Sequence, residues 1–167
     1  MNETGKTGGI RLGLAATIAA SLFLLVPLAT AAELTRDEYV ERAEPICKRN
    51  VEANKRIFKG AKEEVKRGEL KKASRHFFRA ATALKKTIAQ LKAVPRPSAD
   101  AAKLTKWFGY LETEVDYFNR IGKALAAGQK AKAQNLSVRL NRNSSRANNT
   151  VLLFNFDYCK IDPTRFT

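Results

Sequence analysis

The sequence predicts an all-α protein, an up-down-up-down antiparallel four-helix bundle with one disulfide, after an N-terminal signal segment. Three observations support this prediction. Apolar residues recur at helical spacing in four segments, no segment alternates as a β-strand does, and the connections between the segments are short. Short connections make consecutive helices antiparallel, and two widely separated cysteines are available to join distant parts of the chain.

The first 32 residues have the organisation of an export signal. Lys6 and Arg11 precede an uncharged run, Leu12–Ala32, which ends with the small residues Ala29-Thr30-Ala31. Because signal peptidase recognises a small-x-small pattern, we expect cleavage after Ala31 or Ala32. The alternative is an uncleaved membrane anchor, since 21 residues at about 1.5 Å each just span a bilayer core of roughly 30 Å.

Both alternatives place the rest of the chain outside the cytoplasm. The protein is then either secreted or held at the outer face of the cytoplasmic membrane, with residues 12–32 as the tether. Removing residues 1–32 leaves 135 of the 167 residues, enough for a single helical-bundle domain, residues 33–167. The net charge is +15, and omitting Lys6, Arg11 and Glu3 leaves about +14 on this domain.

The first predicted helix begins after Thr35, which forms a capping box with Glu38. Its apolar pattern continues past Pro45 as far as Val65. We therefore expect one helix that bends at Pro45 and ends at Gly68. Its inward positions are Val40, Ala43, Cys47, Val51, Ile57, Phe58, Ala61 and Val65.

Three more helices are predicted, over Glu69–Lys92, from Ser98 as N-cap to Gly128, and from near Gln129 to about residue 154. Pro95 and Pro97 separate the first two of these. Each helix has one apolar face. The inward positions in chain order are Leu70, Ala73, Phe77, Ala80, Ala81, Leu84, Ile88 and Leu91; Leu104, Trp107, Phe108, Leu111, Val115, Phe118, Ile121 and Leu125; and Leu136, Leu140, Ala147, Val151 and Phe154.

Cys47 and Cys159 are the only cysteines in the chain. In an exported chain an even number of cysteines indicates disulfide bonding, and two cysteines allow one pairing. The predicted topology agrees, because the first helix starts and the fourth helix ends at the same end of such a bundle. The bond closes a loop of more than a hundred residues and contributes roughly 4–5 kcal/mol in the chain-entropy model.

Four short motifs occur along the chain after residue 32. They are Leu-Thr-Arg-Asp-Glu-Tyr at Leu34–Tyr39, Ala43 followed by Ile46-Cys47-Lys48, the Pro95-x-Pro97 hinge, and a late lone cysteine. In these motifs the chain resembles a group of small exported helical-bundle proteins of actinobacteria. The resemblance spans most of the chain after the signal segment. Because that group has no assigned activity, the resemblance implies a compartment and a helical bundle but no chemistry.

The titratable residues give no pattern typical of an enzyme, a metal site or a cofactor site. His76 is the only histidine, and the Glu-x-x-His pairs of di-iron bundles are missing because position 73 is alanine. We expect His76 to be a partly exposed helix residue. Glu112, Asp116 and Arg120 follow one another at spacings of four, which is typical of a row of intrahelical ion pairs. The sequence therefore predicts no catalytic residue, no metal and no cofactor.

Lysine and arginine residues form a candidate site for anions. They recur at helical spacing on the first two predicted helices, and we expect the rows to merge into one positive surface. This basic surface consists of Lys55, Lys59, Lys62, Lys66, Lys71, Arg75, Arg79 and Lys86. Outside the cell it would attract anionic lipid headgroups or anionic envelope polymers, such as wall polymers and acidic polysaccharides. Nucleic acid is not expected as a partner, because an exported protein is separated from the nucleic acid inside the cell. The alternative is a solvated charged face.

The favoured function is an exported, non-enzymatic binding or structural module at the cell envelope, which contacts anionic polymers or lipid headgroups through the basic surface. The alternative is an extracytoplasmic carrier of a small ligand bound between the helices. We expect Trp107, Phe118 and a polar face of the fourth helix to line that ligand site. The polar face consists of Asn141, Asn143, Ser144, Ser145, Asn148 and Asn149.

Overall fold

Helices and turns make up the part of the chain that the structure describes. The structure, a computed structural model, describes residues 33–161, and the predicted signal segment at residues 1–32 lies outside the described residues. The elements are α1 (Arg36–Ile57), α2 (Ala61–Lys66), α3 (Leu70–Lys92), the 3-10 turn η1 (Ser98–Asp100), α4 (Ala101–Ala126), α5 (Lys130–Thr150) and the 3-10 turn η2 (Leu152–Phe154). No strand occurs within residues 33–161, so the all-α prediction is confirmed there.

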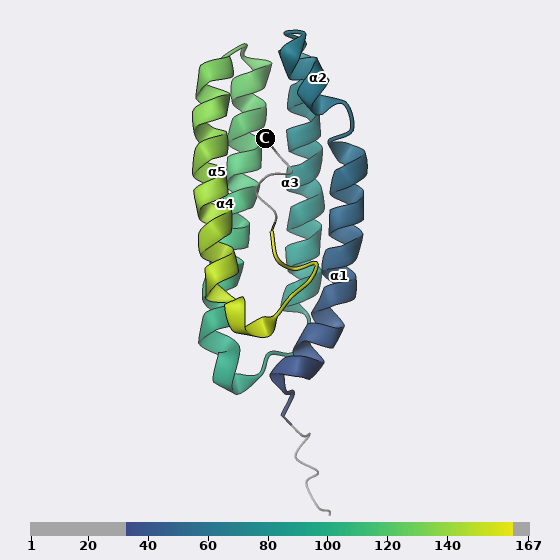
Figure 1. Ribbon diagram of the computed structural model, residues 1–167, viewed down its shortest axis with the longest axis vertical. Helices are drawn as coiled ribbons and strands as arrows, with labels where there is room; N and C mark the ends of the chain where they lie inside the picture. The colour runs from purple at the N-terminus through teal and green to yellow at the C-terminus, as the bar shows by residue number, and fades with distance from the viewer. Residues whose placement is uncertain (1–32, 162–167) are drawn as a thin grey trace, which may run out of the picture. The chain divides into compact units, whose positions relative to one another are not determined.

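The four long helices lie side by side (Figure 1). Helix α4 packs against α3 and α5, and α1 packs against α3. Residues 155–161, termed here the C-terminal segment, leave η2 below α5 and cross to α1 (Figure 1). None of the helices within residues 33–161 is both long enough and apolar enough to span a membrane.

The start of α1 follows the sequence prediction, whereas its end does not. Thr35 is the N-cap: its hydroxyl accepts the backbone N–H of Glu38 at 3.3 Å, and the Glu38 carboxylate accepts the Thr35 N–H at 2.8 Å. Pro45 lies inside α1 and does not end it. The prediction of one helix as far as Gly68 is wrong, because Gly60 adopts a left-handed conformation (φ +85°) that interrupts it.

A side chain from α3 supports the interrupted end of α1. His76 Nδ1 is hydrogen bonded to the carbonyl oxygen of Ile57, the last residue of α1. His76 Nε2 lies 2.9 Å from a carboxylate oxygen of Glu64, which belongs to α2. The only histidine of the chain therefore joins three helices, and its side chain is 14% exposed.

A turn precedes α4, which begins at Ala101. Ser98 starts η1 and does not cap α4, so the prediction of Ser98 as its N-cap is wrong. The Ser98 backbone N–H instead donates to the Glu33 carboxylate at 2.5 Å. Asp100, which is 2% exposed, accepts hydrogen bonds from Arg36 Nε at 2.8 Å and from Lys103 Nζ at 3.1 Å. The Arg36 guanidinium lowers the pKa of Asp100 and ties the start of α1 to the start of α4.

The hydrophobic core contains the apolar faces predicted from the sequence. Every predicted inward position is buried or half-buried. The core also includes a residue from the irregular end of the chain, because Phe156 is 2% exposed and stacks on Trp107 with ring centroids 5.6 Å apart. Phe154 stacks on Phe156 at 5.3 Å and meets Tyr39 of α1 edge-on at 6.0 Å. The C-terminal segment is therefore part of the core.

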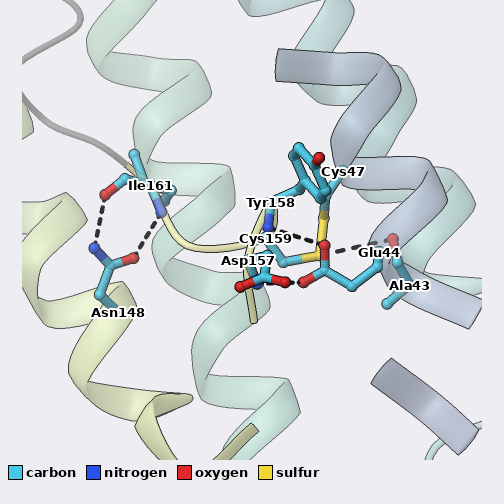
Figure 2. Close-up of a disulfide and its surroundings, with 8 residues drawn as sticks. All are labelled: Ala43, Glu44, Cys47, Asn148, Asp157, Tyr158, Cys159 and Ile161. Atoms are coloured by element: carbon cyan, nitrogen blue, oxygen red, sulfur yellow. Dashed lines mark hydrogen bonds between the residues drawn. A yellow bond between two sulfur atoms is a disulfide. The ribbon is translucent and has the colours of Figure 1, made fainter. Parts of the chain in front are cut away.

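The predicted disulfide attaches the C-terminal segment to α1. Cys47 and Cys159 are bonded, with Cα atoms 5.0 Å apart (Figure 2). One turn earlier on α1, the Glu44 carboxylate accepts the backbone N–H groups of Asp157 and Tyr158 at 2.7 and 2.9 Å. A disulfide of this kind is typical of proteins in oxidising compartments outside the cytoplasm.

On its other side, the C-terminal segment is attached to α5 through the side chain of Asn148. Asn148 Nδ2 donates to the Ile161 carbonyl oxygen at 2.7 Å, and Asn148 Oδ1 accepts the Ile161 N–H at 2.9 Å. Figure 2 shows both attachments. The C-terminal segment thus connects α1 to α5 across the face of the bundle.

Candidate functional site

All eight residues of the basic surface are exposed. Lys55 lies in α1, Lys59 in the turn before α2, and Lys62 and Lys66 in α2, whereas the other four lie in α3. Both α1 and α2 pack against α3, so the eight residues belong to adjoining elements. On α3 they occupy the side opposite its buried positions, as their spacing in the sequence requires.

Most of the basic surface is without an acidic partner. Lys66 forms an ion pair with Glu63 at 2.9 Å. Within residues 33–161, the other seven members have no carboxylate at ion-pair distance. An approaching anion would therefore meet exposed cations without first displacing a carboxylate from them.

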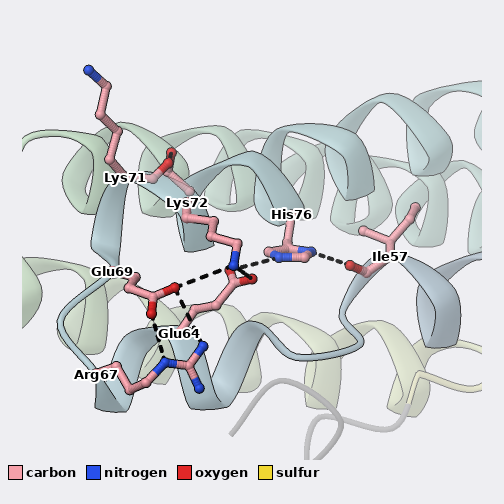
Figure 3. A network of polar contacts seen from close by, with 8 residues as sticks. Ile57, Glu64, Arg67, Glu69, Lys71, Lys72 and His76 are labelled. Atoms are coloured by element: carbon pink, nitrogen blue, oxygen red, sulfur yellow. Dashed lines mark hydrogen bonds and ion pairs between the residues drawn. The ribbon is translucent and has the colours of Figure 1, made fainter.

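Neighbouring acidic side chains are paired with other cations (Figure 3). Glu69 accepts from Arg67 Nε at 2.7 Å and from Lys72 Nζ at 3.4 Å, and Lys72 Nζ lies 3.3 Å from buried Glu64. The hydrogen bonds that the Lys72 ammonium donates to Glu64 and Glu69 raise the pKa of Lys72. Figure 3 shows Lys71 extending away from this network. The network thus pairs both carboxylates without using a member of the basic surface.

A cavity of about 400 Å³ lies between α1, α3, α4 and the C-terminal segment. It is termed here the central cavity. Its wall is mainly apolar and includes Leu84, Leu111 and Phe118, which is typical of small-molecule sites. Exposed lysines also line it, so it opens to solvent on their side; they are Lys55, Lys59 and Lys160.

The lining of the central cavity contains a buried carboxyl group, and burial favours its protonated form. Glu114 is 2% exposed, and this desolvation raises its pKa to about 7. Ser144 Oγ lies 2.6 Å from Glu114 Oε1 and 3.1 Å from the Leu140 carbonyl oxygen. Because a serine hydroxyl has one proton, both contacts are satisfied together when protonated Glu114 donates to Ser144 and Ser144 donates to Leu140.

Three further polar atoms of the cavity lining are buried without a hydrogen-bond partner among the described residues. They are the indole Nε1 of Trp107 and the Oδ1 atoms of Asn50 and Asn54. Trp107 is 0% exposed, so its N–H has no contact with bulk water. A buried polar group without a partner costs free energy, and such groups are therefore uncommon unless water or a ligand supplies the missing bond.

The predicted ligand site between the helices agrees only in part with the lining of the central cavity. Trp107 and Phe118 line the central cavity, as that prediction required. The polar face of α5 does not line it. Asn143 donates to the Tyr110 carbonyl oxygen at 2.9 Å and Ser144 faces Glu114, so these side chains hold α5 against α4.

Asn50 and Asn54 were not predicted as site residues. The sequence could have indicated them, since both fall on the apolar face of α1 that contains Cys47 and Val51. A polar residue at a core position is uncommon unless it has a partner or a role. Glu114 interrupts the apolar face of α4 in the same way, between Leu111 and Phe118.

A second cavity of about 580 Å³ lies between α2, α3, α4 and α5, with Phe77 and Leu125 in its wall and Lys62 and Lys66 at its edge. Asn141 is the one residue of the polar face of α5 that lines it. Within residues 33–161, no group of three or more His, Cys, Asp and Glu residues is placed to hold a metal ion.

Comparisons with protein-family models, with curated proteins and with solved structures found no match for this chain. The fold and the candidate sites define a helical protein with one disulfide, a basic surface and a central cavity. Functional inference therefore rests on the chemistry of these residues.

Proposed function

We propose that the protein is an exported, non-enzymatic binding or structural module of the cell envelope, which contacts anionic polymers or lipid headgroups through the basic surface. One observation carries the proposal: eight exposed lysines and arginines lie on adjoining elements, and seven of them have no acidic partner within residues 33–161. Such a surface attracts polyanions at long range. Export through residues 1–32 is supported by the disulfide, which needs an oxidising compartment.

The proposal includes an up-down-up-down order of the four long helices. Two features support it. The connections from α3 to α4 and from α4 to α5 are short. The Arg36–Asp100 ion pair joins the start of α1 to the start of α4, as this order requires. In this arrangement the signal segment, if it is retained, holds the start of α1 close to the membrane.

Binding to anionic surfaces tests the proposed function. The mature protein is sedimented with vesicles of phosphatidylglycerol, with vesicles of phosphatidylcholine and with purified cell-wall preparations, over a range of salt concentrations. We expect association with the anionic vesicles or with the wall preparation, weakening as salt rises because screening shortens the reach of the charges. Absence of any salt-dependent association would overturn the proposal.

Charge reversal on the basic surface tests whether these residues make the contact with the anionic vesicles or the wall preparation. The variant carries Lys62→Glu, Lys66→Glu, Lys71→Glu and Arg75→Glu, and we expect it to lose binding. Its control carries four reversals at exposed positions of α4 and α5, namely Lys106→Glu, Lys123→Glu, Lys132→Glu and Arg139→Glu. Both variants have the same net charge, so equal loss in both would show a general charge effect and no defined surface.

The central cavity favours a second candidate function, the transport of a small ligand between the helices. Its volume, its apolar wall and its buried polar atoms are features of ligand sites. Retention of a small molecule through purification, insensitive to salt and detected by mass spectrometry of the extracted protein, would support this function. The two functions are separable, because the quadruple variant of the basic surface leaves Trp107 and Glu114 unchanged.

A further inference from the structure

The central cavity has three chemically different zones. Lys55, Lys59 and Lys160 are exposed at its mouth. Leucine and phenylalanine side chains supply much of its apolar wall. Nearly complete burial of Trp107 and Glu114 places them on its inner wall, where the Trp107 N–H has no partner among the described residues. A matching ligand has an anion at one end, an apolar body and an oxygen atom at the other end.

We propose that the central cavity binds an anionic amphiphile, with its acidic group at the mouth lysines, its apolar chain along the wall and a hydroxyl or carbonyl oxygen at the inner wall. This inference deepens the carrier function proposed above and rests on it. It names the class of ligand and the residues that recognise each part.

Charge at the mouth favours an anion over a cation. None of the three mouth lysines has a carboxylate at ion-pair distance within residues 33–161. Among the lining residues within 33–161, Glu114 is the only acidic one, and it is nearly completely buried. A carboxylate or phosphate at the mouth would gain favourable interactions with several lysines while remaining partly hydrated.

The unpartnered polar atoms of the lining favour an oxygen atom on the ligand. The Trp107 N–H can only donate, whereas the Oδ1 atoms of Asn50 and Asn54 can only accept. A hydroxyl group both accepts and donates, whereas a carbonyl oxygen only accepts. A purely aliphatic chain would leave all three atoms without partners, at a cost in free energy.

Displacement of Nile red, a neutral apolar dye, tests the preference for an anion and the preference for a ligand oxygen separately. The competitors are dodecanoate, dodecyl phosphate, ω-hydroxydodecanoate and dodecyltrimethylammonium, which share one chain length. We expect both simple anions to displace the dye at about tenfold lower concentration than the cation does. We expect ω-hydroxydodecanoate to bind about fivefold more tightly than dodecanoate, the effect of about one hydrogen bond. Comparing carboxylate with phosphate shows which acidic group the mouth prefers.

Two pairs of matched variants locate the site. Val51→Trp fills the central cavity, whereas Val138→Trp places the same side chain at the second cavity. Val51→Trp should abolish dye binding, whereas Val138→Trp should not.

A second pair of variants tests the charge at the mouth. The double reversal Lys59→Glu with Lys160→Glu should weaken dodecanoate binding about tenfold, whereas Arg79→Glu with Lys86→Glu should change it less than about twofold. Circular dichroism checks that each variant is folded.

The outcomes distinguish the ligand class from the carrier function. Dye binding that Val51→Trp abolishes, with equal displacement by anions and cation, would leave the carrier function standing and overturn the anionic ligand. Equal affinity for dodecanoate and its hydroxylated analogue would overturn the oxygen atom at the inner wall. Failure of the folded wild-type protein to bind the dye or any competitor would overturn both the ligand class and the carrier function.

Discussion

The carboxylate of Glu44 on α1 accepts a hydrogen bond from the backbone N–H of Tyr158 at 2.9 Å, one residue before the disulfide-bonded Cys159. The same carboxylate accepts the N–H of Asp157 at 2.7 Å. Two different interactions, one covalent and one polar, therefore attach the C-terminal segment to neighbouring turns of α1. Because this segment forms one wall of the central cavity, its attachment matters for both stability and binding.

Replacing Glu44 by alanine should destabilise the protein. The change leaves two backbone N–H groups without their acceptor, and charge-assisted hydrogen bonds are the stronger kind. We expect a loss of about 1–3 kcal/mol in the free energy of unfolding, measured by urea denaturation. Glu41→Ala is the control, since Glu41 is an exposed residue of the same helix with no side-chain bond among the described residues. Equal effects of the two substitutions would contradict this role of Glu44.

Removing the disulfide by replacing both Cys47 and Cys159 with serine should lower stability by about 2–5 kcal/mol. Its loop spans a sequence separation of 112 residues, so the unfolded chain gains much freedom when the bond is lost. Combined with Glu44→Ala, the losses should not add, because both changes release the same segment. A double-mutant cycle in urea measures the coupling, and strictly additive losses would show that the two attachments act independently.

Stability should fall as pH rises because of Glu114, whose pKa burial raises to about 7 from 4.5. The folded state keeps this proton at pH values where the unfolded state has lost it. The contribution is therefore complete below about pH 4.5, is lost as pH rises toward 7, and amounts to about 3 kcal/mol. In Glu114→Gln this part of the pH dependence should disappear from thermal unfolding curves.

Glu52→Gln is the control for Glu114, because Glu52 is exposed on α1. It should leave the pH dependence of stability close to that of the unmodified protein. If Glu114→Gln and Glu52→Gln gave the same pH profile as the parent chain, the buried carboxyl would not be the source of the slope.

Two glycines of α4 should respond in opposite ways to alanine. A Cβ atom at Gly122 would lie 2.9 Å from the ring of Phe78, so Gly122→Ala should destabilise the protein by about 1–3 kcal/mol. A Cβ atom at Gly109 meets nothing within 4 Å, so Gly109→Ala should stabilise it by up to about 1 kcal/mol. Thermal denaturation measures both, and a stabilising Gly122→Ala would show that Phe78 moves aside without cost.

Much of the fold was predictable, because its elements depend on local patterns. The helical spacing of apolar residues identified every buried face, and the capping box at Thr35 placed the start of α1. The disulfide followed from the cysteine count together with the predicted export of the chain. The interruption at Gly60 was missed, because the apolar pattern continues in phase across it and a lone glycine is tolerated in many helices.

The candidate sites were predictable to different degrees. The residues of the basic surface could be found in the sequence, since exposed charges at helical spacing need only one helix to define a face. The central cavity could not, because its lining combines α1, α3, α4 and the C-terminal segment. Only the arrangement of these elements shows that Asn50, Trp107 and Glu114 surround the same space.

The sequence by itself determined most of the helical segments, their buried faces and the exposed cations, because each of these follows from the order of residues within a few turns. The pairing of the two cysteines followed from their number, since two cysteines allow one pairing. Tertiary structure decided that Phe156 enters the core, that His76 joins three helices and that burial raises the pKa of Glu114 to about 7. The physical reason is that desolvation and packing depend on all the surrounding elements together, and a local pattern contains no information about those neighbours.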